Sequence, residues 1–169
     1  MEPLQNPPPP HGEHGVKTAL DVREARPHEL AVAARHYLGM RRELGWNDDA
    51  MRADWETLFV TAYEEGARAG DMRYFVAEAD GAVVGSAVAM RVRAMADRYE
   101  RAARSGYIAN VYVERAHRRK GAARALTTAA MDWLRASGCA VVRLRASPYG
   151  RTLYESMGFT PSDEMELTL

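Results

Sequence analysis

Cysteine, excess charge of one sign and long apolar runs are scarce in this chain of 169 residues. The only cysteine, Cys139, cannot form a disulfide within the chain, and no Cys/His spacing is typical of a zinc site. The 23 basic residues balance 23 acidic ones, which argues against nucleic-acid binding through bulk charge. No stretch approaches 18 apolar residues, which argues against a membrane span. We therefore expect a cytoplasmic protein with no metal, nucleic-acid or membrane partner.

The N-terminal residues 1–17 are rich in proline and glycine and cannot bury a core, so we interpret them as a tail. The tail has neither a basic region followed by an apolar run nor an Arg/Ser-rich amphipathic pattern, so no targeting signal is expected. His11 and His14 could pair on a metal, but a solvated linker is the favoured interpretation. Residues 18–169, with the apolar content of a globular protein, are predicted to form a single domain.

The first half of that domain shows strand and helix patterns in turn. An alternating run over residues 20–25 predicts a strand, and two helical patterns follow, the first of which starts at Pro27. Two runs rich in valine, alanine and aromatic residues are then joined by Asp80-Gly81, which is among the strongest short signals for a β-hairpin.

The second half continues the alternation. Residues 107–113 predict a strand, a helix follows Gly121 and ends near Gly138, and residues 139–146 predict another strand. A short helix is stopped by Gly158, and residues 164–169 are predicted to close the sheet. Together these elements predict an α/β (α+β) fold with a mixed, mostly antiparallel central sheet flanked by helices.

An unusual cluster of cations stands at the start of the helix that follows residues 107–113. Arg118, Arg119 and Lys120 precede Gly121, although the first turn of a helix already carries partial positive charge. A strand, a short connection with glycine and a helix start form a place where backbone N–H groups converge on an anion. The chain has no P-loop or dinucleotide motif to explain the cluster. We therefore expect a bound anion here.

The motif R-x-x-G-x-A at residues 118–123 lies within YIANVYVERAHRRKGAARAL, and GRTLYESMGF follows about thirty residues later. This pair of segments resembles the GNAT superfamily of acyl-CoA-dependent N-acetyltransferases. The resemblance implies acetyl-CoA as cosubstrate, with its pyrophosphate on the backbone amides of residues 119–123 and its pantetheine arm along residues 111–113. It also implies a bulge that parts the two central strands, although the sequence carries no sign of one. The implied cofactor-binding residues are Val111, Tyr112, Val113, Arg118, Arg119, Lys120, Gly121, Ala122, Ala123 and Ser147, the last where many relatives have an asparagine.

The resemblance also implies roles in the chemistry. Tyr154 is the expected catalytic residue, because a hydroxyl near the sulfur could protonate or hydrogen-bond the leaving thiolate; full transfer from a phenol of pKa near 10 is uphill by roughly 2 kcal/mol. The oxyanion is expected to accept a main-chain N–H near Tyr112 or Val113. Asn110, Tyr112 and Trp46 are the expected acceptor-side residues, with Asn110 and Tyr112 on the same strand face as Ile108. The general base stays open among Glu43, Asp48, Asp49, Glu114 and His117.

The leading functional hypothesis is an acetyl-CoA-dependent N-acetyltransferase that acts on a primary amine of a small molecule by direct attack in a ternary complex. Three alternatives stay open: a protein N-acetyltransferase, a CoA-binding protein without transferase activity, and an enzyme with altered chemistry on an acyl thioester. A homodimer is the assembly that the resemblance suggests.

Overall fold

The structure is a computed structural model, and it describes residues 20–47, 51–93, 104–165 and 167. The N-terminal tail, His11 and His14 included, lies outside the described residues. The described elements follow the predicted order and are β1 (Asp21–Glu24), η1 (Pro27–Glu29), α1 (Leu30–Glu43), α2 (Trp55–Arg68), β2 (Met72–Ala79), β3 (Ala82–Arg93), β4 (Arg104–Val113), η2 (Arg115–His117), α3 (Ala122–Ala136), β5 (Val142–Leu144) and α4 (Arg151–Glu155).

The five strands form one sheet in the order β1-β2-β3-β4-β5. Each neighbouring pair is antiparallel except β4 and β5, which are parallel. The predicted hairpin is present, with Asp80 and Gly81 at φ 52° and 76° between β2 and β3. A two-residue turn needs positive φ at both positions to match the twist of its strands. The predicted fold, a mixed and mostly antiparallel sheet flanked by helices, is confirmed.

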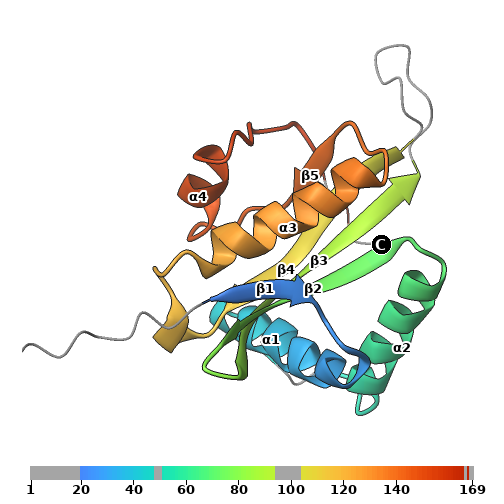
Figure 1. The fold of residues 1–169 in the computed structure, drawn as a ribbon, viewed down its shortest axis with the longest axis vertical. Coiled ribbons are helices and arrows are strands. Elements are labelled where there is room, and N and C mark those ends of the chain that lie inside the picture. Colours follow the sequence, from blue (N-terminus) through green and yellow to red (C-terminus); the bar gives the residue numbers. More distant parts are fainter. Residues whose placement is uncertain (1–19, 48–50, 94–103, 166, 168–169) are drawn as a thin grey trace, which may run out of the picture.

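Two hydrophobic cores lie on opposite faces of this sheet, as Figure 1 shows by the placement of the helices. Helix α3 covers one face with Leu126, Ala130 and Leu134, all of which are completely buried. Helices α1 and α2 cover the other face, where Leu30 and Tyr63 pack against the middle strands. The end of β4 is therefore reached by α1 on one face and by α3 on the other, which positions the site described below.

The prediction of a closing strand over residues 164–169 is wrong for the residues that the structure describes there. Residues 161–165 and 167 form no strand, and the side chains of Met165 and Leu167 are 98% and 81% exposed. Their apolar alternation therefore finds no sheet face to cover, and β5 is the last strand of the described sheet. Strand β4 begins at Arg104, ahead of the predicted strand over residues 107–113, and residues 98–103 lie outside the described residues.

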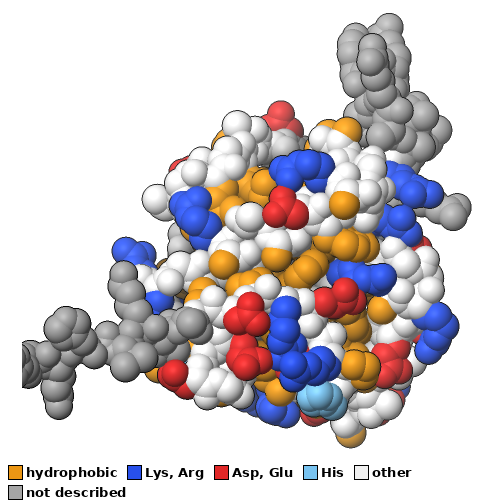
Figure 2. Space-filling model, viewed as in Figure 1, with side chains coloured by type: hydrophobic (Ala, Val, Ile, Leu, Met, Phe, Trp, Pro, Cys, Tyr) orange, Lys and Arg blue, Asp and Glu red, His pale blue; other side chains and the backbone are white. Residues whose placement is uncertain are grey.

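Surface charge is mixed on the face seen in Figure 2, where acidic and basic side chains alternate around patches of hydrophobic atoms. In the part of the chain that the structure describes, no helix combines the length and the apolar character needed to cross a membrane.

Candidate active site

The two parallel strands β4 and β5 separate part-way along the sheet. They pair only from Gly106 with Val142 to Ile108 with Leu144, whereas β4 continues to Val113. The N–H of Glu114 donates to Val84 on the β3 side, and alternation along a strand then turns the N–H and C=O groups of Val111 and Val113 toward the side where β5 has ended. This leaves an open strand edge beside the end of β5.

A β-bulge lies at the point of separation. Ser86 pairs with Tyr112 and Val88 with Ala109, so β4 has one residue more than β3 between these pairs, and Asn110 adopts φ 54°. The bulge changes the predicted face. Ile108 and Ala109 alternate as expected, with Ile108 in the α3 core and Ala109 against the α1 core.

The side chains of Asn110 and Tyr112 then follow Ala109 onto the α1 face. The Asn110 amide lies beside the hydroxyl of Tyr74, where it opposes a larger rise in the pKa of that phenol caused by burial. The ring of Tyr112 lies 5.3 Å from that of His36 on α1. Asn110 and Tyr112 therefore share a face as predicted, but the expectation that Ile108 shares it is wrong, because the extra residue shifts the alternation.

The loop between β4 and α3 has the backbone shape of an anion cradle. Arg119 and Gly121 both have positive φ, at 62° and 91°, and a Cβ added to Gly121 would meet no protein atom within 4 Å. The first α3 hydrogen bond runs from the N–H of Ala125 to the carbonyl of Gly121, so the N–H groups of residues 122–124 point out of the first turn. The geometry fits a phosphate group approaching the backbone at Gly121.

The basic side chains of this loop do not all face that cradle. The Nε of Arg118 donates to the carbonyl of Val113 at 2.7 Å, and its Nη2 donates to both carboxylate oxygens of Glu43 at 2.9 Å. Lys120 donates to the carbonyl of Ala116 at 3.0 Å, while Arg119 is exposed. The Arg118 side chain is therefore committed to the protein, and its contribution to an anion site would come through the loop that it holds.

Glu43 near the end of α1 is the hub of this contact. Besides Arg118, its Oε1 accepts from Arg115 Nε at 3.2 Å and from the Tyr112 hydroxyl at 3.3 Å. The hydrogen bond from Arg118 lowers the pKa of the Glu43 carboxyl, with a further contribution from Arg115, and burial opposes both. A carboxylate stabilised in this way is a weak proton acceptor. Glu43 is therefore better suited to hold the loop than to act as a base.

Tyr154 and Ser147 lie beyond β5, on the other side of the opening. Helix α4 is tied to the start of α3 by a hydrogen bond of 2.6 Å from Arg124 to Ser156. The Tyr154 ring packs edge-on against Phe159, and burial raises the pKa of its phenol. The Ser147 hydroxyl accepts the N–H of Gly150 at 3.2 Å, and among the described residues no hydrogen bond uses its own proton. The raised pKa of Tyr154 favours hydrogen-bond donation by its hydroxyl over full proton transfer.

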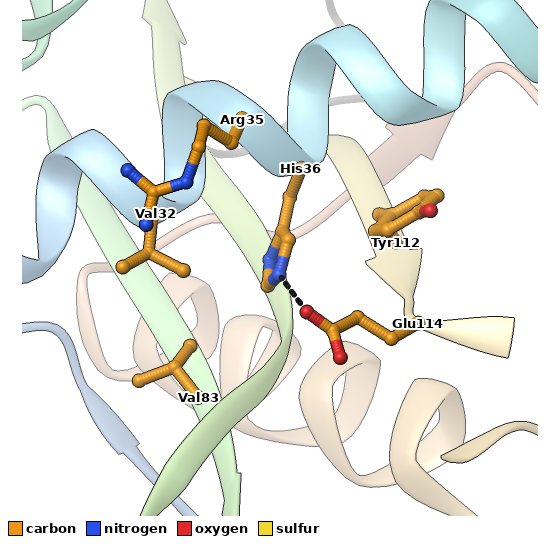
Figure 3. Close-up of a pocket in the computed structure, with 6 residues that line it drawn as sticks. All are labelled: Val32, Arg35, His36, Val83, Tyr112 and Glu114. Carbon is orange, nitrogen blue, oxygen red and sulfur yellow. Dashed lines mark ion pairs between the residues drawn. The ribbon is translucent and has the colours of Figure 1, made fainter. Parts of the chain in front are cut away.

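A cavity of about 450 Å³ lies on the α1 face next to Tyr112 (Figure 3). Glu114 and His36 meet at its wall, where Glu114 Oε1 lies 3.5 Å from the buried Nε2 of His36. The Nδ1 of the same imidazole lies 3.0 Å from the hydroxyl oxygen of Ser86. Burial lowers the pKa of His36 and favours the neutral ring, although Glu114 opposes the shift.

Comparison with models of known protein families shows the family of this chain. The model of the acetyltransferase (GNAT) family matches residues 40–159, which hold the bulge, the cradle and Tyr154. The chain belongs to this family. No curated protein matches its sequence.

Solved structures share this acetyltransferase's fold. A GCN5-related N-acetyltransferase from Ralstonia eutropha JMP134 is 26% identical with a TM-score of 0.80, covering 89% of this chain and 99% of that one. A predicted acetyltransferase from Clostridium acetobutylicum, solved with acetyl-CoA, is 19% identical with a TM-score of 0.80, covering 89% and 96%. The aminoglycoside N-acetyltransferase AAC(6')-Iy, solved with CoA, is 21% identical with a TM-score of 0.67, covering 95% and 97%. The protein is thus a GNAT acetyltransferase.

The remaining residues predicted for this GNAT site are dispersed. Trp46 lies just after α1, 57% exposed, with the Arg41 guanidinium 3.2 Å from its ring centroid. Of the candidate bases, His117 lies in η2, while Asp48 and Asp49 lie outside the described residues. Within the described ranges, no three His, Cys, Asp or Glu side chains gather as a metal site.

Sequence reasoning missed His36 and Ser86. A histidine three residues after the buried Ala33, inside an amphipathic helix, looks like an ordinary member of a buried face. Its significance depends on partners 50 and 78 residues away in Ser86 and Glu114, which only the fold brings together.

Proposed function

We propose that this GNAT enzyme transfers the acetyl group of acetyl-CoA to a primary amine of a small molecule, by direct attack in a ternary complex. The observation that carries the proposal is the open edge of β4, which begins at the bulge and leads to the cradle at Gly121, with a cavity on the α1 face. One linear cosubstrate could occupy edge and cradle together, while an acceptor approaches from the α1 side.

In this proposal the N–H groups of Arg119, Lys120, Gly121, Ala122 and Ala123 bind the diphosphate, and the positive end of α3 adds to the attraction. The peptide groups of Val111 and Val113 bind the pantetheine arm as an added strand would bind. Tyr112 lies between these two residues in the same stretch, and the Ser147 hydroxyl gives the arm a second donor.

The chemistry follows from the groups around the opening. The lone pair of the neutral amine attacks the thioester carbon, the new N–C bond forms, the C–S bond breaks, and the sulfur leaves with its electron pair. A main-chain N–H at Val111 or Val113 stabilises the oxyanion. The Tyr154 hydroxyl donates a hydrogen bond to the sulfur, and the excess protons of the amine pass to a base and to solvent.

The acceptor side is assigned to the α1 face, where the bulge places Asn110 and Tyr112. Trp46, exposed at the end of α1, would border the same side. Among the candidate bases we favour Glu114, because its carboxylate faces the cavity and no arginine of the described residues binds it, whereas Arg115 and Arg118 bind Glu43. A cytoplasmic location and a homodimer complete the proposal.

The test combines binding and turnover. Calorimetric titration of acetyl-CoA measures the donor site, and a thiol-release assay with a panel of primary amines measures transfer. Tight donor binding with amine-dependent thiol release supports the proposal. Binding with no turnover on small amines, and turnover on peptides instead, would favour the protein acetyltransferase.

A further inference from the structure

The cavity on the α1 face carries opposite charges on an apolar frame. It is lined by Val32, Arg35, His36, Val83, Tyr112 and Glu114. Figure 3 shows the Glu114 carboxylate beside His36 at the end of β4, and the Arg35 side chain beyond His36, near Val32 on α1. Its volume of about 450 Å³ lies at the small end of the range for ligand pockets.

The negatively charged residue of the cavity is Glu114, which lies against the buried side chain of His36. The imidazole of His36 is only 4% exposed, and its Nε2 has no hydrogen-bond partner at regular geometry among the described residues. If the Ser86 hydroxyl donates to Nδ1, the proton of the neutral ring lies on Nε2 and points to the Glu114 carboxylate 3.5 Å away. In this arrangement Oε1 of Glu114 faces His36, and the second carboxylate oxygen is left for a ligand.

The positively charged residue of the cavity is Arg35. Arg115 and Arg118 are both bound by Glu43. No hydrogen bond or ion pair joins the Arg35 guanidinium to another residue in the described part of the chain, and its side chain is exposed at the cavity. A guanidinium in this state is suited to bind a carboxylate or another anionic oxygen group.

We infer that this cavity is the acceptor site and that the acceptor is a small zwitterion, with its amino group at Glu114 and an anionic group at Arg35. The inference rests on the proposed function, because it assigns the amine of the ternary complex. The valines give room for a short aliphatic stem. A diamine is disfavoured, because its second ammonium would face Arg35. Tyr112 lines the cavity and lies between Val111 and Val113 on β4, which places the cavity beside the proposed donor site.

The test uses ligand-observed NMR titrations of the full chain with glycine, β-alanine, 4-aminobutyrate and 6-aminohexanoate. Butylamine, butyrate and 1,4-diaminobutane serve as probes that lack one charge or carry the wrong one. Each is titrated into the wild type, Glu114→Gln and Arg35→Gln, with Arg135→Gln on the exposed side of α3 as control.

We expect at least one zwitterion to bind more tightly than the three other probes, and to lose about tenfold in affinity in each cavity variant but not in the control. Butylamine should respond only to Glu114→Gln and butyrate only to Arg35→Gln. If no zwitterion binds, or the best one is insensitive to both variants, the inference is overturned. Acetyl-CoA titration of the same samples separates the two proposals: loss of donor binding in the wild type contradicts the transferase mechanism, whereas the zwitterion titrations judge the cavity independently.

Discussion

Replacing Glu43 by glutamine should weaken acetyl-CoA binding, although Glu43 lies on α1 and not in the cradle. The glutamine keeps the size of the side chain but removes the charge that holds Arg118 at 2.9 Å and Arg115 at 3.2 Å. Arg118 also binds the Val113 carbonyl, so its position fixes the start of the loop relative to the open edge of β4.

The magnitude follows from the geometry. Hydrogen bonds to charged groups contribute about 1.5–3 kcal/mol when buried. The side chains of Glu43 and Arg118 are 25% and 37% exposed, so solvent screening reduces the figure to about 1–2 kcal/mol. If the loop must be ordered for the donor to bind, the same free energy raises the Kd for acetyl-CoA about 5- to 30-fold.

The assay is calorimetric titration of acetyl-CoA into Glu43→Gln, with Asp132→Asn as a control that removes a similar acid–arginine contact on α3. The KM for acetyl-CoA should rise with the Kd, while the KM for the acceptor changes little. A Kd within twofold of the wild type, combined with a lower melting temperature, would refute the reasoning and leave Glu43 a purely structural residue. A tighter complex would also refute it, since it would mean that Glu43 withholds Arg118 from the ligand.

Three further predictions follow. Tyr154→Phe should lower kcat about 10- to 100-fold with little change in the Kd for acetyl-CoA, because it removes a hydrogen bond to the leaving sulfur. An unchanged kcat would mean that Tyr154 only packs in the fold. Asn110→Ala should unfold in urea with about 1 kcal/mol less stability than Asn110→Gly, because φ is 54° there; equal stability would contradict the strained bulge. The contact with Arg23 lowers the pKa of Glu29 from 4.5 to about 2. The ionised Glu29 therefore contributes at most about 3 kcal/mol to the free energy of unfolding above pH 4.5, and this contribution is lost as the pH falls toward 2. Glu29→Gln should flatten this acid dependence in denaturant melts, and a variant with the wild-type slope would contradict it.

The sequence predicted the elements whose signals are local. The Asp80-Gly81 turn, the helix after Gly121 and the strand over 107–113 depend on residues close in the chain, and all three are present. The closing strand failed for the described residues, because alternation indicates a strand only where a sheet face is available, and Met165 has none. The bulge at Asn110 left no mark in the pattern and shifted the face on which side chains lie.

The site was predictable where a backbone conformation needs a particular residue. Gly121, at φ 91° with open space beside it, is such a position. The partners of side chains were not predictable, because they are distant in sequence. Arg118 was assigned to the anion by its place in the motif, yet the fold brings Glu43 to it from 75 residues away. The contact between Glu114 and His36 was likewise not predictable, because the two residues are 78 positions apart in the sequence.

The central claim is that the loop before α3 is the donor site, and titration of acetyl-CoA into Gly121→Glu tests it most directly. The substitution places bulk and negative charge where a Cβ meets open space, so it creates no clash, and the strain of a side chain at φ 91° costs about 1–2 kcal/mol. Gly138→Glu is the matched control, because Gly138 has φ 83° and the same open surroundings at the other end of α3. We predict tight binding to the wild type and to Gly138→Glu, with loss of binding in folded Gly121→Glu. Equal binding to all three proteins would contradict the account.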